Sequence, residues 1–236
     1  MGLPGGQTTP ERGAAQPAAS PSGLDSAAEI ASLSRVFDPD VSRERILAAA
    51  ITIVADRGFG AFTVREVAQA AGLKAPGLYS HFPSKEAILT EAVSRVLADF
   101  IANATSVAGR DPEEELRETV RRHVLYQIDN MHIARVTDLV LNTATAAPFL
   151  SADDYDRLLF EQRAYLDLVR ERVAAFAPAL TTPAVAVVSN AIVAMCDRVA
   201  NWFQADDTLR ADELADLHWH MARGMLAELA SDPAAS

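Results

Sequence analysis

The sequence has a single cysteine, few aromatic residues and no excess of positive charge. Because Cys196 has no second cysteine to pair with, an internal disulfide is excluded. Residues 1–20 contain neither the basic stretch nor the apolar stretch of a secretory signal peptide. No apolar run reaches the roughly 18–20 residues that cross a bilayer. We therefore expect a soluble cytoplasmic protein that does not associate with membranes.

The net charge of −11 argues at first against a nucleic-acid partner. The charge is unevenly distributed, however. Residues 41–85 carry six Lys and Arg against three Asp and Glu, a net charge of +3, whereas residues 101–236 carry twelve against twenty-one, a net charge of −9. A locally positive segment on an acidic protein can still bind DNA, since the acidic remainder discourages non-specific association.

Alanine, leucine, valine, arginine and glutamate dominate the composition, which favours an all-α fold. Residues 1–40 are instead rich in glycine, proline, alanine and serine, so we expect a disordered N-terminal tail. A weakly amphipathic piece over residues 27–37 leaves open the alternative that part of this tail packs against the rest.

Residues 42–91 predict four helices joined by tight turns. An apolar stripe indicates a first helix over residues 43–57, ended by Gly58. Thr63 and Glu66 form a capping-box pattern that begins a second helix over residues 64–70. Gly72 makes the next turn, before a short third helix over residues 75–81. Ser84 then caps a longer helix over residues 85–104.

The remaining chain also predicts helices, over residues 112–129, 133–143 and 152–176. Apolar residues then recur at spacings of three and four over residues 185–202 and 214–225, a pattern typical of helix bundles. We expect the last two helices to pair with those of a second copy, in a homodimer interface that includes Val188, Ile192, Met195, Val199, Trp202, Leu217, Met221 and Met225.

Two helices joined by a glycine turn, the second of them short, describe a helix-turn-helix. In such a motif the first residues of the second helix contact base edges in the major groove of DNA. Leu78 and Phe82 are apolar and four residues apart, so they should anchor that helix in the core. The predicted DNA contacts are Thr63, Arg65, Lys74, Ala75, Pro76, Gly77, Tyr79, Ser80, His81 and Lys85.

These residues resemble the N-terminal domain of the TetR family of bacterial regulators. The similarity is carried by Phe62-Thr63-Val64, Ala71-Gly72 and the run from Leu78-Tyr79 through His81-Phe82-Pro83-Ser84-Lys85-Glu86. It implies a helix-turn-helix domain over residues 41–88 and a ligand-binding and dimerisation domain over residues 89–231. It also implies a homodimer that binds a palindromic operator in double-stranded DNA, usually as a repressor, and is released by a small-molecule effector.

The segment from His132 through Tyr165 is similar to regulators of lipid or sterol breakdown, which implies an apolar or acyl-CoA-like effector. Arg135 and Arg163 are candidate partners for an anionic ligand, although ion pairs with nearby aspartates are an equal alternative. The predicted ligand-binding residues are Tyr126, Met131, Arg135, Leu139, Phe149, Phe160 and Arg163.

No pattern in the sequence indicates a cofactor, a metal site or catalysis. His218 and His220 are two residues apart on a helix and point in different directions. Two alternatives to the regulator stay open. One is a small-molecule-binding or enzymatic helical bundle with a vestigial helix-turn-helix, and the other is a regulator controlled by a protein partner.

Overall fold

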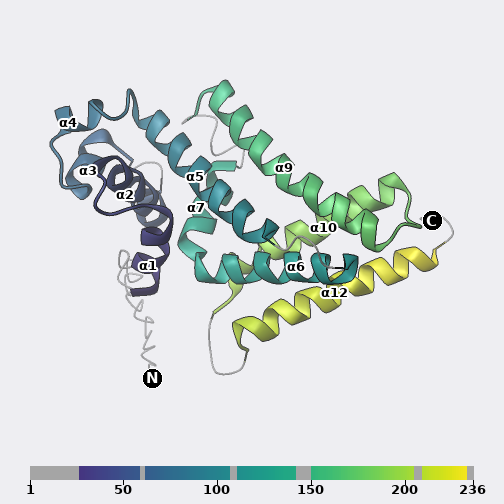
Figure 1. Ribbon diagram of the computed structural model, residues 1–236. Helices are drawn as coiled ribbons and strands as arrows, with labels where there is room; N and C mark the ends of the chain where they lie inside the picture. The colour runs from purple at the N-terminus through teal and green to yellow at the C-terminus, as the bar shows by residue number, and fades with distance from the viewer. Residues whose placement is uncertain (1–26, 59–61, 107–110, 142–149, 205–208, 233–236) are drawn as a thin grey trace, which may run out of the picture.

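The computed structural model describes residues 27–58, 62–106, 111–141, 150–204 and 209–232. Its helices are α1 (Ala27–Val36), α2 (Ser42–Arg57), α3 (Val64–Ala70), α4 (Ala75–Tyr79), α5 (Lys85–Thr105), α6 (Pro112–Asp129), α7 (Met131–Leu141), α9 (Ala152–Phe176), α10 (Thr182–Asp197), α11 (Val199–Trp202) and α12 (Ala211–Ser231). Figure 1 shows α2, α3 and α4 grouped at one end, which we call the head. Helix α5 leads from the head into the body, formed by α6 to α12.

The head is built as its sequence predicts. Helices α2 and α3 begin and end within one residue of the expected positions. The Thr63 hydroxyl accepts a hydrogen bond from the Glu66 backbone amide, and Ser84 caps α5 in the same way. Gly72, with a φ of 70°, turns the chain between α3 and α4. This turn sets the direction of α4 relative to α3.

The body has a hydrophobic core of its own. Apolar side chains of α6, α9, α10 and α12 meet there, including the buried Leu116, Val169, Ile192 and Trp219. Figure 1 shows α12 lying along α6, and Arg121 on α6 pairs with two aspartates of α12. The hydrophobic residues form two clusters that both include residues of α5. The head's cluster also includes Val136 of α7 and Leu158 of α9, so α5 and α7 both connect the head to the body.

Helix α1 corrects the expectation of a disordered tail over residues 1–40. Residues 1–26 lie outside the described part of the chain, but residues 27–36 form a helix. Leu33 and Phe37 are buried in the core of the head. Arg35 also donates a hydrogen bond to the Asn130 side chain, with a distance of 2.8 Å. Composition predicted disorder here, yet Leu33 on α1 and Phe37 just after it are buried and hold this segment against the head.

One described stretch, Thr182–Trp202, is long and apolar enough by composition to cross a membrane. It is interrupted after Asp197, where α10 ends and the short α11 begins. Val188, Ile192 and Cys196 on this stretch are almost completely buried in the body core. One face of this stretch thus lies in the body core, while Val187 on it is 69% exposed.

Candidate functional site

Helix α4 divides its side chains between the core and the outer surface. Leu78 and the following Phe82 are only 0% and 1% exposed, so they anchor the helix as the spacing predicts. Between them, Tyr79 is 55% exposed, although it is a large aromatic residue. Lys74 and Pro76, at the start of the helix, are also exposed. A short helix with buried anchors thus presents an aromatic hydroxyl and a cation to the solvent.

An arginine that the sequence analysis did not single out fixes the far end of this helix. Arg43 of α2 donates hydrogen bonds to the His81 backbone carbonyl and to the Glu91 carboxylate. Its guanidinium also lies over the Phe82 ring, 4.0 Å from the centroid. Arg43 therefore ties the turn between α4 and α5 to α2. No local sequence pattern could have indicated this role, because its partners are 38 to 48 residues away.

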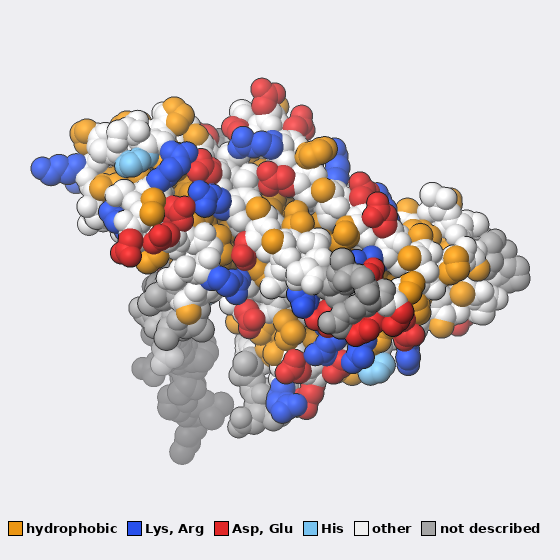
Figure 2. Space-filling model, in the orientation of Figure 1, with side chains coloured by type: hydrophobic (Ala, Val, Ile, Leu, Met, Phe, Trp, Pro, Cys, Tyr) orange, Lys and Arg blue, Asp and Glu red, His pale blue; other side chains and the backbone are white. Residues whose placement is uncertain are grey.

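Four cations on the head have no carboxylate partner among the described residues. Arg45 donates instead to the Ala71 and Pro39 carbonyls and the Ser42 hydroxyl. Arg65, Lys74 and Lys85 take part in none of the ion pairs found in that part of the chain, whereas Arg57 pairs with Glu66 at 3.0 Å. Figure 2 shows a Lys or Arg side chain projecting from the outer edge of the head, where the surrounding surface is uncharged. Arg65 and Lys74 are exposed and Lys85 is half-buried, and unpaired cations beside a projecting helix are suited to contacts with phosphates.

Two of the predicted polar contacts already have hydrogen bonds within the head. The Thr63 hydroxyl donates to the Glu66 carboxylate, with a distance of 2.7 Å, in addition to capping α3. The Ser80 hydroxyl donates to the Gly77 carbonyl, with a distance of 2.6 Å. Both hydroxyl oxygens keep only acceptor capacity, so neither is free to donate to a phosphate without giving up a local bond.

Gly77 has no structural reason, within the described part of the chain, to be glycine. A Cβ atom built at Gly77 would meet nothing within 4 Å, and the backbone does not have a positive φ there. The absence of a side chain instead leaves the middle of α4 open to the outside. A flat, open position beside Tyr79 lets another molecule approach the helix backbone closely.

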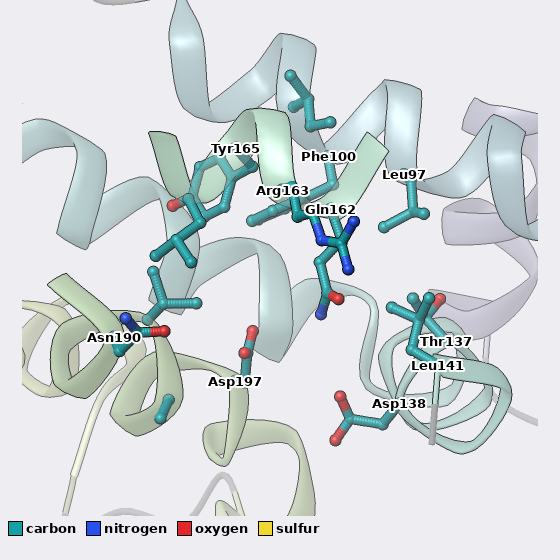
Figure 3. A pocket seen from close by; sticks show the side chains of 14 residues that line it. Leu97, Phe100, Thr137, Asp138, Leu141, Gln162, Arg163, Tyr165, Asn190 and Asp197 are labelled. Atoms are coloured by element: carbon teal, nitrogen blue, oxygen red, sulfur yellow. The ribbon is translucent and has the colours of Figure 1, made fainter. Parts of the chain in front are cut away.

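A second candidate site is a cavity of about 270 Å³ in the body. Its walls come from α5, α7, α9 and α10. The apolar lining comprises Leu97, Phe100, Ile101, Leu141, Leu166, Val193 and Ala194. The polar lining comprises Thr137, Asp138, Gln162, Arg163, Tyr165, Asn190 and Asp197. Figure 3 shows Asp138 and Asp197 facing a common space, with Arg163 on its opposite side.

A buried hydrogen-bond network lies directly behind this cavity. The Tyr165 hydroxyl and His123 Nδ1 are 3.0 Å apart, and His123 Nε2 is 2.9 Å from Asp197 Oδ1. Burial raises the pKa of the Tyr165 hydroxyl well above its usual range, so this group stays protonated and donates to the imidazole. The Nε2 atom of the same imidazole faces Asp197 Oδ1. The chain of bonds fixes one oxygen of the Asp197 carboxylate.

The predicted ligand-binding residues do not share this cavity. Only Arg163 lines it. Phe149 lies outside the described residues, and Phe160 is 72% exposed on the outer face of α9. The remaining four have other surroundings: the Tyr126 hydroxyl donates to Asp99, Met131 lies beside α1 and α2, Arg135 donates to the Ala200 carbonyl, and Leu139 packs against the head core. The residue types were suitable, but helical spacing did not show which helix face meets the cavity.

The predicted dimer residues also separate into two groups. Val188, Ile192 and Val199 are at most 2% exposed and belong to the core of their own subunit, so their assignment to a surface interface was wrong. Met195 and Met225 are partly buried against the same core. Trp202, Leu217 and Met221 are 53%, 50% and 48% exposed, and Val187, which was not predicted, is 69% exposed. The outer faces of α10 and α12 therefore carry apolar side chains.

Two protein-family models match this chain. The model described as bacterial regulatory proteins of the tetR family matches residues 46–92, which contain α3, α4 and the turn between them. The model described as the tetracyclin repressor-like C-terminal domain matches residues 109–226, which is half of the chain and contains most of the body. The first matched range covers most of the head, and the second covers most of the body.

Individual relatives agree with these matches. The HTH-type transcriptional repressor KstR2 of Mycolicibacterium smegmatis is 44% identical over 63 residues, which is 27% of this chain and 29% of that repressor. The match thus spans less than a third of the curated relative.

Solved structures of similar fold cover far more of the chain. A tetR-family regulatory protein from Rhodococcus RHA1 has a TM-score of 0.69 at 23% identity, covering 78% of this chain and 96% of that protein. AibR in complex with isovaleryl coenzyme A and operator DNA has a TM-score of 0.66 at 21% identity, with coverages of 77% and 97%. At these identities the structural likeness establishes the fold alone.

Proposed function

Because this chain belongs to the TetR family of bacterial regulatory proteins, we propose that it is a cytoplasmic, homodimeric transcriptional repressor that leaves a palindromic operator when a small molecule binds its body. In this role the head binds DNA, the outer faces of α10 and α12 hold the two subunits together, and the cavity binds the effector. The chain acts by binding and has no catalytic step.

The arrangement of α4 carries the proposal. Its buried anchors, Leu78 and Phe82, hold it rigidly, while Tyr79 projects outward. The open backbone at Gly77 allows α4 to enter the major groove. Lys74, at the start of the helix, lies where a base edge or a phosphate is contacted in helix-turn-helix complexes.

The cations of the head supply the general attraction to DNA. Arg65, Lys74 and Lys85 have no carboxylate partners in the described part of the head, so their charge is available to phosphates. Ala75 and Gly77 offer no side-chain hydrogen bonds. Base recognition then depends on Lys74, Tyr79, apolar contact with thymine methyl groups and the shape of the DNA.

The exposed apolar residues of α10 and α12 support the dimer. Val187, Leu217 and Met221 project from these helices without being covered by their own subunit. Gly224, two turns from Leu217, has open space where its side chain would be, so another helix can approach closely there. Two such pairs of helices around a two-fold axis would place two heads about 34–36 Å, or a multiple of it, apart.

The cavity supports regulation by a small molecule with an apolar body. Its volume of about 270 Å³ is sufficient for a short alkyl or acyl chain. It lies against α5, which continues into the head. A ligand that fits only one position of α5 relative to α9 and α10 would favour one spacing of the two heads. It can shift the equilibrium between two such spacings by no more than the difference in its affinity for them.

A gel-shift measurement with the intergenic DNA beside the chain's own gene tests DNA binding. We expect the wild-type protein to retard this DNA at low salt, and Tyr79→Ala to bind more weakly. Phe160→Ala is a matched control, because Phe160 is an exposed aromatic residue on α9, outside the head. Absence of any shift at low salt would contradict the proposal.

The dimer is tested by light scattering of the eluting protein during size-exclusion chromatography. We expect a dimer for the wild type and a monomer for the double variant Leu217→Asp, Met221→Asp, because carboxylates would be desolvated in the interface. Phe160→Asp places a carboxylate at another exposed apolar position and should stay dimeric. A wild-type monomer, or a dimeric double variant, would refute this interface.

A further inference from the structure

The cavity in the body gathers two carboxylates on one side, and this property narrows the class of its ligand. Asp138 and Asp197 face the same space in Figure 3. Carboxylates at pH 7 accept hydrogen bonds and donate none. Arg163 is the cation of the lining among the described residues, and it comes from the exposed surface of α9 together with the Gln162 amide.

Two further polar groups of the lining already donate within their own helices. The Thr137 hydroxyl donates its one hydrogen to the Ile133 carbonyl, with a distance of 3.0 Å, so only its acceptor capacity is left. The Asn190 amide nitrogen donates one of its two hydrogens to the Ala186 carbonyl, with a distance of 2.7 Å, so one N–H and the amide oxygen are left. Both side chains therefore contribute an acceptor beside the two carboxylates.

A buried acceptor without a partner lies behind Asp197. Gln127 is only 8% exposed, and its Nε2 is 3.4 Å from Asp197 Oδ1. Its Oε1 is buried and accepts no hydrogen bond from any residue that the structure describes. A buried unsatisfied acceptor costs free energy until a donor reaches it. Gln127 does not line the cavity, so this acceptor belongs to the buried network behind Asp197.

The apolar residues of the lining suit the hydrocarbon part of a ligand, and an aromatic ring lies among them. Leu97, Ile101 and Val193 supply aliphatic surface, and Phe100 packs edge-on against Tyr165 at a centroid distance of 4.7 Å. Aromatic faces also attract cations electrostatically. The cavity therefore combines apolar walls with acceptors gathered on one side.

We propose that the effector is an organic cation, an alkyl or arylalkyl amine whose protonated head binds between Asp138 and Asp197 and whose apolar body lies against Leu97, Phe100 and Val193. This inference rests on the proposed function, since it assigns the chemistry of the effector in the same cavity. A primary ammonium carries three donors, which suits an acceptor-rich wall. A fatty-acid carboxylate would instead place its negative charge beside two carboxylates, and an uncharged acyl thioester would offer them no donor.

The ionisation of Asp138 agrees with this assignment. Burial, together with the nearby charge of Asp197, raises the pKa of the Asp138 carboxyl, while Arg198 opposes the shift. The Arg198 guanidinium contacts Asp138 Oδ2 at 3.1 Å from the end of α10, and His123 faces the pair from α6. A bound ammonium would add a positive charge beside Asp138.

Three probes with the same eight-carbon chain test the head-group preference. Octylamine, 1-octanol and octanoate are titrated calorimetrically into the full-length dimer at pH 7, with isovaleryl coenzyme A as a fourth ligand. We expect octylamine to bind roughly tenfold or more tightly than octanoate, since like charges across a partly buried site are unfavourable. Tighter binding of octanoate or of the thioester would overturn the proposal.

Variants locate the binding site of the amine. Asp138→Asn should weaken octylamine binding by roughly tenfold, the effect of removing one charge-assisted hydrogen bond, and leave 1-octanol unchanged. Asp167→Asn is the matched control, because Asp167 pairs with Arg170 on the exposed side of α9 and lies outside the cavity. Thermal unfolding of each ligand-free variant verifies that the fold is retained. An unchanged affinity of Asp138→Asn for octylamine would overturn the assignment.

The same preparations separate the two proposals. Binding of DNA by the ligand-free protein without any binding of octylamine would overturn the amine assignment and leave the regulator intact. Binding of octylamine without any binding of DNA would overturn the proposed function and leave the cavity's chemistry intact. If both hold, octylamine should release the protein from DNA, and Asp138→Asn should resist release at the same amine concentration.

Discussion

The head and the body differ in the share of their cations that pair with carboxylates. In the body, arginines such as Arg121, Arg122 and Arg198 pair with carboxylates of the same subunit. On the head, Lys74 and Lys85 have no such partners among the described residues. The comparison explains how a chain with a net charge of −11 can bind DNA, because local pairing decides which cations are available.

We expect the largest effect from a substitution of a side chain that anchors α4. The head presents its cations to DNA only if α4 is held in place. Phe82→Ala should lower the free energy of unfolding by about 3–5 kcal/mol, because it empties a buried site and removes the ring that Arg43 covers. Chemical denaturation measures this change. Phe160→Ala, at a position 72% exposed, should have little effect. Equal losses for the two variants would contradict the described packing of the head.

Removal of one unpaired cation tests the comparison more directly. Lys85→Ala should weaken binding to all DNA sequences alike and reduce the slope of log K against log salt by about one unit. Arg170→Ala removes a cation that pairs with Asp167 in the body, at 2.8 Å, and should leave the slope unchanged. Fluorescence anisotropy at several salt concentrations gives both slopes. An unchanged slope for Lys85→Ala would mean that Lys85 does not contact a phosphate.

A substitution of Gly77 should change the stability of the head and its affinity for DNA in opposite directions. Gly77→Ala should raise stability by up to about 1 kcal/mol, because alanine favours a helix and its Cβ meets nothing in the subunit. The same methyl group should weaken DNA binding, because it occupies the open surface of α4. Thermal unfolding and anisotropy measure the two effects. Unchanged affinity in a stabilised variant would show that DNA does not approach α4 at this position.

The smallest expected effect concerns the ionisation of Asp138 in the body and its influence on stability. The pKa of Asp138 is raised above its ordinary value of 3.8, so its ionised form favours the unfolded chain. Asp138→Asn should therefore equal the wild type in stability below pH 3.8 and become more stable as the pH rises through the raised pKa. The gain should be only a few tenths of a kcal/mol, since the side chain is 32% exposed and pairs with Arg198. Thermal unfolding at a series of pH values measures it, and a variant less stable than the wild type at pH 7 would contradict the sign.

The head could be predicted almost completely from the sequence because its determinants are local. Thr63 and Ser84 cap their helices as expected, and the four-residue spacing of Leu78 and Phe82 placed both in the core. The exceptions are contacts between distant residues, such as Arg43 with Glu91. Caps and turns depend on a few neighbouring residues, and a sequence displays these directly.

The body could be predicted only as a set of helices. Its cavity is lined by residues from Leu97 to Asp197 on four helices, and no local spacing brings such residues together. The dimer prediction was partly wrong for a related reason. Helix α10 is apolar on both faces, so the pattern could not show that Val187 is exposed and Val188 is buried. Periodicity identifies apolar stripes but not the surface that each stripe contacts.

Selection of binding sites from a pool of random double-stranded DNA tests the central claim most directly. The purified full-length protein is incubated with the pool, and the retained sequences are determined over several rounds. A homodimer that binds through α4 should enrich inverted repeats whose half-sites lie about one or more helical turns apart, and Tyr79→Ala should reduce that enrichment. Recovery of sequences without two-fold symmetry, or no enrichment over the starting pool, would contradict a dimeric regulator of palindromic operators.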